Sequence, residues 1–168
     1  MAITQLMEIL EQLTERHERL LALSEVKRDV VIHDRVDDLM KITAEENALV
    51  KEITRLEILM RQSVVQAAAA FGVELGESHT ISDLMQVMPD RHEAERNRIA
   101  KERQKLVETI SRLRENNELN RQLIQQSLDY ISFQIDILTD APEQDMMYQK
   151  PTDEQQVKKR TGLFDRKA

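Results

Sequence analysis

The stretch from Ile99 to Leu138, IAKERQKLVETISRLRENNELNRQLIQQSLDYISFQIDIL, contains neither glycine nor proline. Its apolar residues return at intervals of three and four, which is the spacing of one face of an α-helix. The stripe that they form is Ile99, Leu106, Ile110, Leu113, Asn117, Asn120, Ile124, Leu128, Ile131, Ile135 and Leu138. We expect a single helix from Asp90 to Thr139, about 75 Å long at 1.5 Å per residue.

The first helix of the chain begins near Ile3 and is interrupted after Val31. Apolar residues keep the helical spacing along it, and His17, Ser24 and Lys27 fill the edge of its core face. The apolar positions of this stripe are Ile3, Leu6, Leu10, Leu13, Leu20 and Val31. The same register would carry Asp34, Asp38 and Lys41 into the seam. The phase must therefore change near His33, and Asp34 is a suitable N-cap for the next helix.

The second helix runs from this break to Gly72. Its stripe is Val36, Leu39, Thr43, Glu46, Val50, Ile53, Leu56, Met60, Val64, Ala67 and Phe71. Gly72 followed by Val73 is typical of a helix end at which the glycine adopts a left-handed conformation. The first two helices then form a hairpin. One long helix with a phase shift through Asp34 is the alternative, because neither glycine nor proline marks the break.

A short helix is expected between Gly72 and the last long helix. Thr80 and Asp83 have the spacing of a capping box, directly before Leu84, Met85 and Val87. Pro89 ends this short helix. The second helix would be about 55 Å long, which is shorter than the last one, so one end of the last helix should project from the bundle.

Composition agrees with this arrangement. Of 168 residues, 40% are apolar, 33% are charged and 3% are aromatic, with three glycines and three prolines, so burial must occur in narrow helical stripes. We predict an all-α, elongated antiparallel coiled coil, or bundle of three long helices, with a short connecting helix. This helical coiled-coil domain takes residues 1–142, and residues 143–168, which lack periodicity, form a flexible C-terminal tail.

Several classes of protein are excluded. No apolar run approaches the roughly 20 residues that cross a bilayer, and the N-terminus lacks a signal peptide, so we expect a cytoplasmic protein without membrane insertion. The net charge of −7 opposes nucleic acid as a partner. The eight Lys or Arg residues between Arg91 and Arg114 lack the interleaved aromatic residues that stack on bases.

Catalytic motifs are missing. None of the four histidines follows a glutamate by three residues, as a di-iron bundle requires, and the zinc-protease pattern is absent too. Without cysteine there is no thiolate ligand or nucleophile, and the scattered glycines form no phosphate-binding loop. We predict no enzyme, no metal and no cofactor.

Two asparagines interrupt the stripe of the last helix. Asn117 and Asn120 stand where apolar residues should continue. A seam asparagine lowers stability but fixes the register and the number of helices, because its amide must find a hydrogen-bonding partner. We predict this structural role for both, and contact with a partner protein is the less favoured alternative.

A second apolar row lies near the end of the same helix. Tyr130, Phe133 and Ile137 are spaced i, i+3, i+7 beside the main stripe, so the helix is apolar on two sides where it should outrun its neighbours. The row is covered by the tail, by a second copy or by a partner helix. We predict that these three residues bind a partner protein.

The order of these features resembles the FlgN-type flagellar export chaperones. The resemblance rests on Lys27 and Asp34 before Leu39, on the run from Glu46 to Arg61, and on Phe71-Gly72. The later half is more similar still, with Asn117, Asn120, Leu123-Ile124 and Leu128-x-Tyr130, and with Tyr148 and Phe164-Asp-Arg-Lys-Ala168 in the tail.

This resemblance implies a cytoplasmic chaperone that binds flagellar hook-associated proteins through their terminal amphipathic helices. Such a chaperone prevents premature assembly and delivers its cargo to the cytoplasmic domain of the flagellar type III export gate. The late-helix tyrosine of similar chaperones, matched by Tyr130, would contact the gate. The alternative from the residues alone is a structural coiled-coil adaptor or dimerisation protein, and a homodimer is compatible with either.

Overall fold

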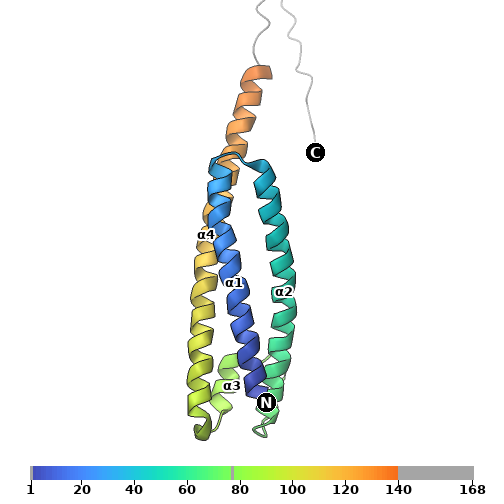
Figure 1. The fold of residues 1–168 in the computed structure, drawn as a ribbon, viewed down its shortest axis with the longest axis vertical. Coiled ribbons are helices and arrows are strands. Elements are labelled where there is room, and N and C mark those ends of the chain that lie inside the picture. The colour runs from blue at the N-terminus through green and yellow to red at the C-terminus, as the bar shows by residue number, and fades with distance from the viewer. Residues whose placement is uncertain (1, 77, 140–168) are drawn as a thin grey trace, which may run out of the picture.

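A computed structural model of the protein describes residues 2–76 and 78–139. Its helices are α1 (Ala2–Ile32), α2 (Val36–Ala69), α3 (Ile81–Val87) and α4 (Glu93–Thr139), with a 3-10 turn at Asp90–His92 directly before α4. The chain ascends along α1, descends along α2, passes α3 at the lower end and returns along α4 (Figure 1). The predicted all-α fold, with three long helices and a short one, is confirmed. The predicted tail, residues 143–168, lies outside the described residues.

The break between α1 and α2 is a tight turn built around Asp34. This residue has a left-handed backbone conformation, with a φ angle of 53°. Its N–H donates to the Val31 carbonyl at 3.3 Å, and the N–H of Arg35 donates to the Val30 carbonyl at 3.0 Å. These bonds close the C-terminus of α1 as a Schellman motif. The predicted hairpin is therefore confirmed, but the predicted N-cap is wrong: Arg35 occupies that position, without a side-chain cap.

The end of α2 repeats the same motif with glycine. Gly72 has a φ angle of 77°, its N–H donates to the Ala69 carbonyl at 2.9 Å, and the N–H of Val73 donates to the Ala68 carbonyl at 3.1 Å. The helix stop predicted at Gly72 is confirmed. The two Schellman turns reverse the chain at opposite ends of α2.

The short helix α3 closes the lower end of the bundle. The Thr80 hydroxyl accepts a hydrogen bond from the Asp83 N–H at 3.3 Å, and the Thr80 N–H donates to the Asp83 carboxylate at 2.7 Å, which confirms the capping box. The Thr80 backbone and hydroxyl donors together hold the pKa of Asp83 below its usual range. Leu84 is fully buried in the core.

Helix α1 is the centre of the bundle. It packs along α2 on one side and along α4 on the other, whereas α2 and α4 make no substantial contact with each other within the described residues. The core is most tightly closed at the lower end, where α3 joins the long helices. The apolar side chains with no more than 2% exposure there are Leu6, Leu10, Leu13, Val64, Ala67, Ala68, Leu84 and Ile99.

The open arrangement explains why the predicted stripe of α2 is wrong in its first half. Val36 and Val50 are 63% and 50% exposed, and the buried positions are Ile42 and Leu49. The predicted stripe would suit a closed bundle in which α2 contacts both other helices. In this fold α2 packs on only one of the other long helices, α1, so its buried face is rotated.

Helix α4 extends past the turn between α1 and α2 (Figure 1). Every residue from Leu128 to Thr139 is exposed. We call this segment the projecting end. Its existence confirms that the last helix outruns its neighbours.

Candidate functional site

The projecting end carries seven of the sixteen large apolar residues that are exposed in the described chain. Its large apolar residues are 50% to 79% exposed: Leu128, Tyr130, Ile131, Phe133, Ile135, Ile137 and Leu138. A helix with apolar residues on two sides is normally buried. In this protein the other helices end before they can cover it, so the surface is available to another segment or molecule.

The predicted binding row lies on this surface. Tyr130, Phe133 and Ile137 are 61%, 60% and 55% exposed. Within the described residues, the only side-chain hydrogen bond of the row is local, from the Gln134 amide to the Tyr130 hydroxyl at 2.7 Å. The structure brings the three residues together on one exposed helix segment. Their role in binding a partner stays a prediction.

The structure places the two asparagines of the predicted seam in different surroundings. Asn120 is 2% exposed, and its side-chain amide donates to the backbone carbonyl of Ser24 in α1 at 2.7 Å. Asn117 is exposed. Asn120 is thus held against α1, where an amide can fix the register of α4, whereas Asn117 lies at the edge of a groove.

A third asparagine completes this polar contact and was missed in the sequence. Asn116 donates to the Ser24 hydroxyl at 3.3 Å and accepts a hydrogen bond from the Arg28 guanidinium at 2.8 Å. It lies outside the apolar stripe of α4, so periodicity gave no indication of it. Ser24, which stands in the core stripe of α1 without an apolar side chain, is the one signal that a polar partner was required.

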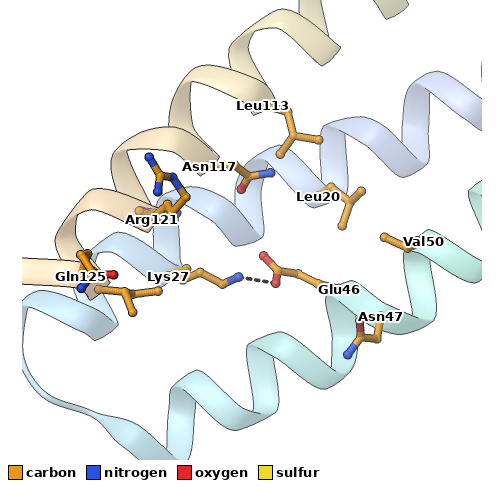
Figure 2. A pocket seen from close by; sticks show the side chains of 11 residues that line it. Leu20, Lys27, Glu46, Asn47, Val50, Leu113, Asn117, Arg121 and Gln125 are labelled. Carbon is orange, nitrogen blue, oxygen red and sulfur yellow. Dashed lines mark hydrogen bonds and ion pairs between the residues drawn. The ribbon is translucent and has the colours of Figure 1, made fainter. Parts of the chain in front are cut away.

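A groove separates α2 from α4, with α1 as its floor (Figure 2). It has a volume of about 460 Å³ and is lined by Leu20, Lys27, Glu46, Asn47, Val50, Leu113, Asn117, Asn120, Arg121, Ile124 and Gln125. An ion pair crosses its floor from Lys27 of α1 to Glu46 of α2, and both side chains are largely buried. The groove is therefore polar and electrically neutral at its floor.

The cation at the edge of the groove is neutralised by its own helix. The Arg121 guanidinium donates to the Glu118 carboxylate at 3.0 and 2.9 Å. Hydrogen bonds from Arg121 and from Gln122 lower the pKa of Glu118 to about 2. Beyond Arg121, α4 contains no Lys, Arg or His through Thr139.

Among residues 2–76 and 78–139 no group of three His, Cys, Asp or Glu side chains could hold a metal ion. None of the helices described is long and apolar enough to span a membrane.

A profile of the FlgN protein family matches residues 1–156. The chain belongs to the FlgN family. Over 169 aligned residues, which cover 100% of both chains, this FlgN protein is 28% identical to the uncharacterized protein YvyG of Bacillus subtilis (strain 168). No solved structure shows a significant match to it.

Membership of the FlgN family confirms the predicted resemblance and implies the role of a flagellar export chaperone. FlgN proteins are chaperones and have no enzymatic activity, so the prediction of a protein without a catalytic site is confirmed at the level of the family. In this FlgN protein the projecting end of α4 leaves the predicted row Tyr130, Phe133 and Ile137 exposed.

Proposed function

We propose that this FlgN protein binds flagellar hook-associated proteins in the cytoplasm, prevents their premature assembly, and delivers them to the cytoplasmic domain of the flagellar type III export gate. The observation that carries the proposal is the projecting end of α4. It exposes two apolar faces at once, in a chain whose family consists of export chaperones.

The physical means is recognition of an amphipathic helix. A subunit that is to be assembled later has apolar helical stripes that must stay covered until then, and another helix with apolar faces can cover them. Residues Tyr130, Phe133 and Ile137 would supply the contact, because aromatic side chains with large exposed area are typical anchors of such interfaces. Holding a helix in this way requires no cofactor.

Titration of the protein with a purified hook-associated subunit tests the proposal directly. We expect a one-to-one complex in the calorimeter, and we expect the double substitution Phe133→Ala and Ile137→Ala to weaken it strongly. The matched control is Val107→Ala, since Val107 is a similarly exposed apolar residue, at 53%, in the part of α4 that packs on α1. Absence of binding by the unaltered protein would refute the proposal.

A structural adaptor that dimerises through the projecting end is the competing function. It predicts a mass that doubles with concentration and no affinity for hook-associated subunits. Light scattering over a hundredfold range of protein concentration distinguishes the two. A homodimer that dissociates when the subunit is added would be consistent with the chaperone, because the same surface would then serve both contacts.

A further inference from the structure

The exposed apolar surface does not stop at the projecting end. Where α4 passes the turn between α1 and α2, Ile32 and Val36 of that turn are 58% and 63% exposed. Two neighbouring hollows of about 170 and 530 Å³ lie between the turn and α4. Both are lined by Val31, Asp34, Val36, Ser127 and Ile131. We call this junction the turn corner.

The size of the projecting end indicates that it cannot be the whole binding site. From Leu128 to Thr139 it is about 18 Å long at 1.5 Å per residue, and one side of a helix of that length and about 10 Å diameter offers roughly 300 Å². A stable protein interface buries about 800 Å² on each partner. A partner that binds well must therefore contact more than one side of the projecting end, and the turn corner is the adjoining apolar surface.

The charge around the turn corner is acidic. Residues 29–41 contain four aspartates against one arginine and one lysine. Those two cations are already engaged, since Arg35 pairs with Asp29 at 2.5 Å and Lys41 with Asp38 at 3.0 Å. On the projecting end the only charged residues are aspartates.

Of the carboxylates without a cationic partner within the described residues, three lie in the turn corner or on the projecting end: Asp34, Asp129 and Asp136. Asp37 is also unpaired, but it lines neither hollow. Asp34 lines both hollows. Opposite charges at the rim of an interface favour association and exclude partners of like charge. A second copy of this chain would bring more aspartates to the same place, so it is the less suitable occupant.

We propose that the helix of the exported subunit docks in the turn corner as well as along the projecting end, and that this helix carries Lys or Arg beside its apolar stripe. The inference rests on the proposed chaperone function, whose cargo it describes. In this arrangement one apolar side chain of the cargo helix enters the hollow beside Val31 and Ile131. Basic residues on its flanks face Asp34 and Asp129.

Neutralising the three aspartates tests the charge of the occupant. The variant combines Asp34→Asn, Asp129→Asn and Asp136→Asn, and asparagine tolerates the left-handed conformation at position 34. Its matched control combines Glu11→Gln, Glu57→Gln and Glu74→Gln, which change the net charge equally at exposed sites without ion pairs in the described structure. The probes are two synthetic amphipathic helices with one apolar stripe, flanked in one peptide by Lys and in the other by Glu.

We expect the Lys-flanked peptide to bind the unaltered protein more tightly than the Glu-flanked peptide. The aspartate variant should lose about tenfold in affinity for the Lys-flanked peptide at low salt, from three ion pairs of ordinary surface strength, and the control variant should lose nothing. Equal affinities for the two peptides, or equal losses in the two variants, would overturn the proposal.

Substitution of the turn itself tests its part in docking. The variant Ile32→Ser with Val36→Ser alters exposed side chains, so its thermal melt should stay unchanged while its affinity for a hook-associated subunit falls at least tenfold. If the unaltered protein binds the subunit and this variant binds it equally well, the turn corner is not part of the site although the chaperone function stands. If the unaltered protein binds the peptides but no subunit, the chaperone function fails. If the substitutions change only self-association, the occupant is a second copy and the proposal is wrong.

Discussion

Replacing Tyr130 by alanine separates a binding role from a structural role. Truncation of a buried aromatic side chain costs about 3 to 5 kcal/mol of folding stability. Tyr130 is 61% exposed, and the one side-chain hydrogen bond that it makes within the described residues, from Gln134, is local to the same helix. Less than half of the ring is therefore shielded, and we expect the free energy of unfolding to fall by less than about 1 kcal/mol.

The expected loss in binding is larger. An aromatic anchor at the centre of an interface contributes about 2 kcal/mol or more when truncated, which is about a 30-fold loss in affinity. Tyr130→Phe keeps the ring and removes the hydroxyl, so it shows whether the loss comes from apolar contact or from a hydrogen bond to the partner. We expect the phenylalanine variant to retain most of the affinity for the hook-associated subunit if the ring is the anchor.

Two measurements on the same preparations decide the outcome. Circular dichroism gives the melting temperature, and calorimetry gives the affinity for a hook-associated subunit and, separately, for the cytoplasmic domain of the export gate. Val107→Ala is the control for loss of an exposed apolar side chain on α4. A collapsed melt with unaltered binding to both partners would show that Tyr130 is structural and would remove it from the binding surface.

Substitutions at three further places test the structural reasoning: the turn at Asp34, the two seam asparagines and the cap of α3. Asp34→Gly should raise the free energy of unfolding by about 1 kcal/mol in urea titration, because glycine adopts the φ of 53° without strain; a loss would mean that the aspartate side chain stabilises the turn. Asn120→Asp should lower the free energy of unfolding by about 3 kcal/mol, because a buried carboxylate would face the Ser24 carbonyl. The control Asn117→Asp, at an exposed position, should change the free energy of unfolding by less than about 0.5 kcal/mol. Thr80→Ala should cost about 1 kcal/mol by removing the cap of α3, seen as faster amide exchange in that helix. The pKa of Asp83 is lowered in the folded protein. The stabilisation that its carboxylate gives should therefore be complete above the unfolded pKa of about 3.9 and should be lost as the pH falls through the folded pKa. Asp83→Asn should abolish this dependence of the melting temperature on pH.

The elements that the sequence predicted well are those whose signals are local. Gly72 ends α2 because glycine is the residue that most readily adopts a positive φ, and the Thr80 and Asp83 pair caps α3 through contacts four residues wide. The helix break predicted at Asp34 is correct, but the N-cap role predicted for Asp34 is wrong. It takes the position that glycine takes at the other end of α2, and an aspartate there has the sequence appearance of an N-cap.

Features that depend on how helices are placed relative to one another were predicted less well. The stripe of α2 follows from apolar periodicity alone and places Val36 and Val50 in the core, but both are exposed. Asn116 was missed because its partners, Ser24 and Arg28, are about ninety residues away in the chain. Periodicity identifies an apolar face, but it does not say which neighbour covers that face.

The length of α4 connects the fold to the proposed function. Helix α4 has 47 residues and α1 has 31, which at 1.5 Å per residue makes α4 longer by about 24 Å. Since α3 and the 3-10 turn bring the start of α4 level with the lower end of the bundle (Figure 1), the excess must appear at the other end. Most helical stability comes from packing of an apolar face. A helix that extends past its neighbours without a partner has nothing to pack against there, so its surface would be expected to become polar. In this chain the opposite occurs: the apolar residues continue on two faces past the point where α1 and α2 stop. Within the described residues the bundle covers little of those side chains, and this is why we propose that a partner covers the surface that they form.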